Sequence, residues 1–185
     1  MQSLTADEDR VANLEHLDAR LRWLAAWIIH NAHHLRGSED GIKVGAHQAS
    51  CPSMSTIMAA LYFHALDPND RVAVKPHAGP LLHAIHYLLG AQSLDAMKAF
   101  RGFGGVQSYP SRTKDSIPVD FSTGSVGLGV AITAFASLVQ DWLIAHGAPA
   151  ALSWLGGVMG HRVSPLGTGR FGQTGTCSNA LPIIA

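Results

Sequence analysis

The chain has 185 residues, with 13 basic and 13 acidic side chains, so its formal net charge is zero and its length suffices for one domain with a hydrophobic core. This balance gives no electrostatic reason to expect a nucleic acid or an anionic membrane as partner. Charged residues make up only 14 % of the sequence, against roughly 25 % in average soluble domains, so we expect a partner to cover part of the surface.

The sequence favours a soluble, cytoplasmic protein. The N-terminus MQSLTADEDR is polar and lacks the apolar segment of a signal peptide. The longest apolar runs, such as residues 23–29, are far shorter than the roughly 20 residues that span a bilayer. Cys51 and Cys177 are isolated in the sequence, which is typical of a reducing compartment.

In chain order, apolar spacing predicts helices at residues 11–36, 53–65, 81–90 and 93–101, and in the segment 121–147, where a glycine-rich turn precedes an apolar helix. Ser93 is the predicted N-cap of its helix, and Gly90 closes the helix before it. One or two strands are predicted, near residues 71–75 and at 118–122. Residues 102–120 are rich in Gly and Pro and are predicted to form a long loop.

Residues 148–185 differ in composition from the rest of the chain. They contain no Asp or Glu, and their only formal charges are Arg162 and Arg170. They show neither helical nor strand periodicity, so we expect a poorly ordered tail behind an ordered domain of residues 1–147. The abrupt change also suggests the hypothesis that the chain is a truncated or frameshifted copy of a longer protein.

Three loops share one design, in which small residues precede a predicted helix: GAHQAS (45–50), KPHAGP (75–80) and TGSVGLG (123–129). Small residues let a backbone approach a ligand closely, and the following helix N-terminus favours anions. Taken singly, each loop also has a structural interpretation, either a hydrogen-bonded loop histidine or a close-packed turn. Three such loops together, two of them with a histidine, favour a cofactor cleft.

The three loops occur in a fixed order, and QSYPSR (107–112) precedes TGSVGLG. Together these motifs resemble the N-terminal, diphosphate-binding domain of the transketolase superfamily, the thiamine-diphosphate enzymes. The QSYPSR element is closest to the homodimeric bacterial pyruvate dehydrogenase E1 branch. The resemblance covers about residues 14–147. It implies a helix-rich α/β fold, with an incomplete parallel sheet flanked by helices.

The resemblance also implies roles for individual residues. Three residues would line the cleft and take part in catalysis: His47, His77 and Tyr109. The two histidines would contact the diphosphate or the substrate, and the tyrosine would face the substrate. Those that would bind the cofactor, beside the diphosphate or in the turn that meets the aminopyrimidine ring, are Ser50, Gly124, Val126 and Leu128.

The family holds thiamine diphosphate through Mg²⁺, whose ligands come from a Gly-Asp-Gly-like motif that should follow residue 147. The acid-free tail offers no carboxylate for this hard cation, and no pyrimidine-binding domain with its activating glutamate is present. We therefore predict no metal ligand in this sequence, no tight binding of thiamine diphosphate and no turnover by this chain alone.

Three interpretations remain open. The chain is either a non-catalytic member of the family or one subunit of a split enzyme, completed by a second copy or by a chain that carries the pyrimidine domain. A different class is a small metal-binding module built on His30, His33 and His34, which have helical spacing.

Overall fold

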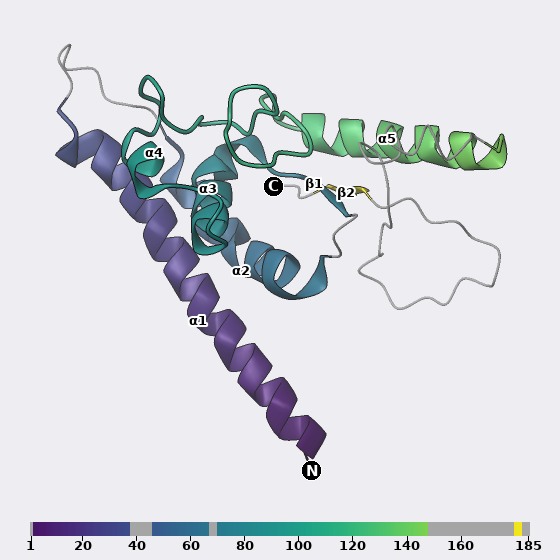
Figure 1. The fold of residues 1–185 in the computed structure, drawn as a ribbon, viewed down its shortest axis with the longest axis horizontal. Helices are drawn as coiled ribbons and strands as arrows, with labels where there is room; N and C mark the ends of the chain where they lie inside the picture. The colour runs from purple at the N-terminus through teal and green to yellow at the C-terminus, as the bar shows by residue number, and fades with distance from the viewer. Residues whose placement is uncertain (1, 38–45, 67–69, 148–179, 183–185) are drawn as a thin grey trace.

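The computed structural model describes residues 2–37, 46–66, 70–147 and 180–182. The α-helices are α1 (Gln2–His30), α2 (Pro52–Ala60), α3 (Gly79–Leu88), α4 (Leu94–Lys98) and α5 (Leu128–Ala145). Shorter 3-10 and π-helical turns extend or precede them: η1 (Asn31–Leu35), η2 (Gln48–Ser50), η3 (Leu61–Ala65) and η4 (Pro76–Ala78). The strands β1 (Arg71–Ala73) and β2 (Ala180–Pro182) pair in parallel, with Val72 opposite Leu181 (Figure 1).

The prediction of an α/β fold with an incomplete parallel sheet flanked by helices is wrong. In the described residues the fold is helical. Its strands form a single pair of three residues each, which is too small to form a sheet layer that helices could cover. Residues 118–122, considered above as a second strand, are loop. The physical reason lies in the neighbouring sequence, because Pro76 ends the β-like run and the Gly- and Pro-rich segment 102–120 offers no regular ladder partner.

The helices fall where apolar spacing predicts them, although α1 begins nine residues earlier than the predicted residue 11. Residues 6–13 are mostly polar and exposed, and the start of α1 projects beyond the other helices, so no apolar periodicity marks it (Figure 1). Ser93 is the N-cap of α4, as predicted, because its Oγ accepts a hydrogen bond from the backbone N–H of Ala96 at 3.2 Å. Gly90, with φ +77°, follows α3.

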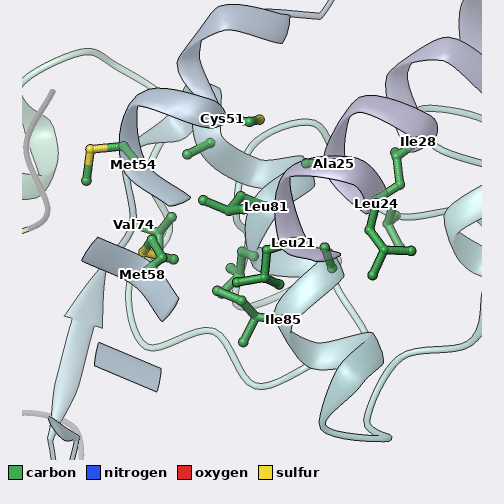
Figure 2. Packing of buried hydrophobic residues seen from close by; sticks show 14 of the residues in the cluster. Leu21, Leu24, Ala25, Ile28, Cys51, Met54, Met58, Val74, Leu81 and Ile85 are labelled. Atoms are coloured by element: carbon green, nitrogen blue, oxygen red, sulfur yellow. The ribbon is translucent and has the colours of Figure 1, made fainter. Parts of the chain in front are cut away.

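The core lies where α1 crosses α2 and α3 (Figure 2). Its central side chains are almost fully buried: Leu21, Ala25 and Ile28 of α1, Met54 and Met58 of α2, and Leu81 and Ile85 of α3. Burial of each large apolar side chain contributes ~1.5–3 kcal/mol relative to leaving it exposed. This packing fixes the ends of α2 and α3, and the loops that precede these two helices carry His47 and His77.

A smaller apolar cluster attaches α5 to β1. Ala73 of β1 packs with Phe121, with Ala136 of α5 and with the partly buried Ile132. Beyond this contact α5 extends away from the other helices and exposes large apolar side chains, among them Phe135, Leu138 and Trp142 (Figure 1).

None of the helices in the described ranges is long and apolar enough to cross a membrane. The predicted poorly ordered tail, residues 148–185, lies outside the described residues apart from the strand β2.

Candidate functional site

His47 lies in the loop that leads into α2, described from Ala46 onwards. The turn η2 follows it directly, and the backbone N–H of Ser50 donates to the His47 carbonyl at 3.2 Å. Pro52 occupies the first helical position, where its missing N–H leaves no intrahelical bond unmade. The His47 imidazole is exposed at this helix entrance, and Ser50 is half-buried.

His77 lies in η4, between the end of β1 and the start of α3. The Cys51 thiol, 3.8 Å from the His77 carbonyl, connects this loop to the one that carries His47. Gly79 allows a third segment to come close, because a Cβ atom at this position would lie 2.3 Å from the carbonyl oxygen of Ser108. Glycine at position 79 thus places Tyr109 beside His77.

The rings of the three predicted catalytic residues form one cluster. The His47 and His77 rings stack, with centroids 3.8 Å apart and an interplanar angle of 29°. The Tyr109 ring lies 5.7 Å from that of His77, tilted by 46°. His77 and Tyr109 are 30 and 62 positions away from His47 in the sequence, yet the three rings lie together. The catalytic roles of these residues remain a prediction.

These rings line a small hollow that encloses about 10 Å³, room for about one water molecule. Its lining residues are Ala46, His47, His77, Pro80, Phe100, Arg101, Ser108 and Tyr109. A ligand of any size would therefore sit at the mouth, with only one end inside.

The electrostatics of the hollow favour a neutral His77. Desolvation, and then the charges of His47 and Lys75, lower the pKa of the His77 imidazole below its ordinary value. A neutral imidazole can donate a hydrogen bond through one nitrogen and accept a proton at the other. The site can thus offer hydrogen-bond donors to an anion, and a base near neutral pH.

The glycine-rich turn is held near the same loops but lies outside the hollow. Thr123 is buried, and its Oγ1 donates to the Val74 carbonyl at 2.6 Å. The predicted cofactor-binding residues that follow are exposed, Val126 by 74 % and Leu128 by 40 %, and Gly124 is also at the surface. None of the described residues that line the hollow belongs to this turn, and Ser50 is not among them.

Arg101 was not among the predicted site residues, yet it lines the hollow. It has φ +59°, whereas the other described residues at positive φ are all glycines. The sequence held a weak signal for it, because Arg101 opens the turn RGFGG, where chain reversal demands unusual backbone angles.

The donors around the hollow suit an anion and not Mg²⁺. They are imidazoles, a guanidinium and a phenol, whereas Mg²⁺ requires oxygen ligands, mainly carboxylates. Within the described ranges, no group of three or more His, Cys, Asp or Glu side chains could hold a metal ion. The rings of His30 and His34 lie 4.8 Å apart, but they belong to no such group. The residues present therefore fit a diphosphate or a carboxylate, and do not fit the accompanying metal.

No protein-family model matches this chain, and no curated protein matches it either.

Proposed function

We propose that this chain forms one part of a thiamine-diphosphate site of the transketolase-superfamily type, for 2-oxo acid decarboxylation or transfer of a two-carbon unit. The observation that carries the proposal is that His47, His77 and Tyr109, from three separate motif-like loops, surround one hollow. Loop residues that share no local structural reason to meet are brought together by the packing of α2 and α3 against α1 and by the approach of Ser108 to Gly79, which supports a common ligand.

In this proposal His47 and His77 contact the diphosphate or the substrate, and Tyr109 faces the substrate. Ser50 would lie beside the diphosphate, and Gly124, Val126 and Leu128 would meet the ring end of the cofactor. None of these four residues contributes to the described lining of the hollow, so in this proposal the cofactor extends beyond it.

The site would also require groups that the described residues do not supply. Residues 148–185 contain no Asp or Glu, so ligands for Mg²⁺ would come from elsewhere, together with the pyrimidine half of the site. A complementing chain that carries the pyrimidine domain would supply them, and a homodimer is the alternative assembly. A cytoplasmic location agrees with Cys51, which is buried as a free thiol.

The test is a titration of the purified chain with thiamine diphosphate and Mg²⁺, followed by calorimetry and by the NMR signals of the His47 and His77 imidazoles. Helix N-termini contribute only ~0.3–1 kcal/mol each when exposed, so we expect a dissociation constant on the order of 1 mM. Thiamine without the diphosphate should not shift either imidazole, and pyruvate should not be consumed.

His47→Ala and His77→Ala should weaken this binding further, whereas His64→Ala, an exposed position outside the hollow, should not. A low-micromolar dissociation constant would contradict the need for a second chain. If neither imidazole responds to thiamine diphosphate, the assignment of the site is wrong.

A further inference from the structure

A groove lies where α1 passes the C-terminal end of α3. Its volume is about 450 Å³, within the range typical of small-molecule sites. We call it the α1–α3 groove, and its lining residues are His16, Ala19, Arg20, Trp23, Leu24, Tyr87 and Leu88. None of the described residues lines both this groove and the hollow around His47, and the two lie at opposite ends of α3. A ligand in the groove would therefore use groups that the proposed function does not.

The α1 wall of the groove follows from helical spacing. His16, Ala19, Arg20 and Trp23 recur at intervals of three and four residues, which places them on one face of the helix. Leu24 anchors this face, because it is buried in the core that α1 shares with α3. Ala19 is exposed, and its methyl group is the smallest side chain on the wall. The groove therefore has room at this position that a larger side chain would fill.

Aromatic side chains give the groove a flat apolar surface. Trp23 is 62 % exposed, and its ring stacks on that of Trp27, with centroids 6.5 Å apart and an interplanar angle of 17°. This stacking restricts the orientation of the Trp23 ring before any ligand binds. Tyr87 and Leu88 of α3 are half-buried and complete the lining. Rings of this kind supply a large contact area at a small cost in conformational entropy.

The polar groups of the groove favour an anion. Arg20 is exposed, one turn after His16, and it forms no hydrogen bond or ion pair with the other described residues. No Asp or Glu occurs among the described residues that line the groove. Asp18 is engaged elsewhere, since its Oδ2 accepts the Thr56 hydroxyl of α2 at 3.0 Å, and Glu15 is not a lining residue. An arginine at an acid-free rim complements a carboxylate.

We propose that the α1–α3 groove binds a small aromatic carboxylate, whose ring contacts Trp23 and Tyr87 and whose carboxylate meets Arg20 at the rim. The ring buries its faces against the aromatic lining, and the charged end stays accessible to water. A protein partner fits less well, because seven lining residues are far fewer than the roughly 20–30 that a stable protein interface uses on each side.

The experiment titrates the full chain with 2-naphthoate and follows the NMR signal of the Trp23 indole N–H, which comparison with Trp23→Phe assigns. We expect a saturable shift with a dissociation constant of about 0.1–1 mM. Uncharged 2-naphthamide should bind several-fold more weakly, and the cation 2-naphthylmethylammonium more weakly still. The indole signal of Trp142, which is exposed on α5 away from the groove, should not move.

Ala19→Leu tests the space in the groove. Leucine is a good helix former and the position is exposed, so thermal stability should be unchanged. The larger side chain should fill the groove and weaken the binding of 2-naphthoate by about tenfold or more. Ala12→Leu is the matched control, because Ala12 is an exposed alanine of α1 that does not line the groove. It should bind 2-naphthoate as the wild type does.

Arg20→Gln tests the charge at the rim. Because Arg20 is exposed, we expect an affinity for 2-naphthoate that is only about three- to fivefold lower, and an unchanged affinity for 2-naphthamide. Arg10→Gln removes an arginine from an exposed ion pair with Asp7 outside the groove and should change neither.

Undiminished binding in Ala19→Leu, or equal affinity for the anionic, neutral and cationic probes, would overturn the inference. A Trp23 signal that shifts with protein concentration in the absence of any probe, together with a dimer in sedimentation, would identify a second copy of the chain as the occupant and would also overturn it.

Discussion

At the scale of single residues, Thr123 connects the loops that form the site. Its buried hydroxyl donates to the carbonyl of Val74, which directly follows β1 and lies three residues before His77. Its backbone N–H donates to the carbonyl of Pro110, the residue after Tyr109, at 3.1 Å. Through its side chain and its backbone, Thr123 therefore joins the glycine-rich turn to both neighbouring loops.

We predict that Thr123→Val lowers the free energy of unfolding by ~1–3 kcal/mol, because the buried Val74 carbonyl would lose this donor. Thr133→Val is the matched control. Thr133 is equally buried, but its hydroxyl bonds to the carbonyls of Gly129 and Val130, within its own helix. The control should cost less than ~1 kcal/mol. Urea unfolding of both variants measures the difference, and equal losses would show that the bond to Val74 has no special weight.

At the scale of elements, the loop that carries Tyr109 is organised by a buried polar network. The Asp115 carboxylate is fully buried and accepts the backbone N–H groups of Gln107 and Ser111. On the other side, Nε2 of His83 lies 2.8 Å from the Gln107 carbonyl, and its Nδ1 lies 3.4 Å from the side-chain amide of Gln92. A neutral His83 with its proton on Nε2 satisfies both partners, and burial lowers the pKa of this imidazole accordingly.

Asp115→Asn should loosen this loop. The amide oxygen can accept one backbone N–H, but its NH₂ group then faces the other donor, so one buried hydrogen bond is lost. We expect faster hydrogen exchange at the amides of Gln107 and Ser111, and a loss of ~1–3 kcal/mol in stability. Asp95→Asn, an exposed position in the first turn of α4, is the control and should leave these amides unchanged. Unchanged protection in Asp115→Asn would contradict a role of the carboxylate in ordering the Tyr109 loop.

At the scale of the whole molecule, α3 carries buried imidazoles into the core that α1 and α2 complete. His86 is almost fully buried, and its ring packs edge-on against that of Tyr62, with centroids 6.2 Å apart. Desolvation, and then the charge of His83, lower the pKa of His86 to about 4. The folded state therefore contains a neutral histidine that the unfolded chain would protonate at mildly acidic pH.

This difference predicts a loss of stability in acid. The pKa of His86 falls from 6.5 in its ordinary state to about 4 in the folded chain, so the unfolded chain binds more protons between these values. Above pH 6.5 His86 is neutral in both states, so its pKa shift does not change the free energy of unfolding. As the pH falls from 6.5 toward 4, the free energy of unfolding decreases. The slope for this single group reaches at most ~1.4 kcal/mol per pH unit.

Urea unfolding of the wild type and His86→Leu across this pH range measures the effect. The variant should show a flatter dependence on pH, because it has lost a group that titrates on unfolding. His64→Gln, at an exposed position on η3, should keep the wild-type slope. An unchanged slope in His86→Leu would show that His86 is accessible to protons in the folded state.

Much of the local structure follows from the sequence alone. The apolar spacing of Leu21 and Ile28 predicts α1, and the capping of α4 by Ser93 follows from a polar side chain next to a helical segment. These features depend on neighbours within one or two helical turns, so residue order suffices to determine them. The polar start of α1 carries no such pattern, so the sequence does not predict the helix before residue 11.

Tertiary structure decided the fold class and the surroundings of the site. Within the part of the chain that the structure describes, the short β-like run at Val72 pairs only with β2, more than a hundred residues away, and such pairing depends on packing and not on local preference. The contact between His77 and Tyr109 needs Gly79 to admit the Ser108 backbone, and Arg101 reaches the same hollow through a turn fixed by Arg36. The sequence by itself determined which segments are helical and which loops carry imidazoles. Only long-range packing determined which of those side chains meet, because contacts between distant residues leave no periodic pattern in the chain.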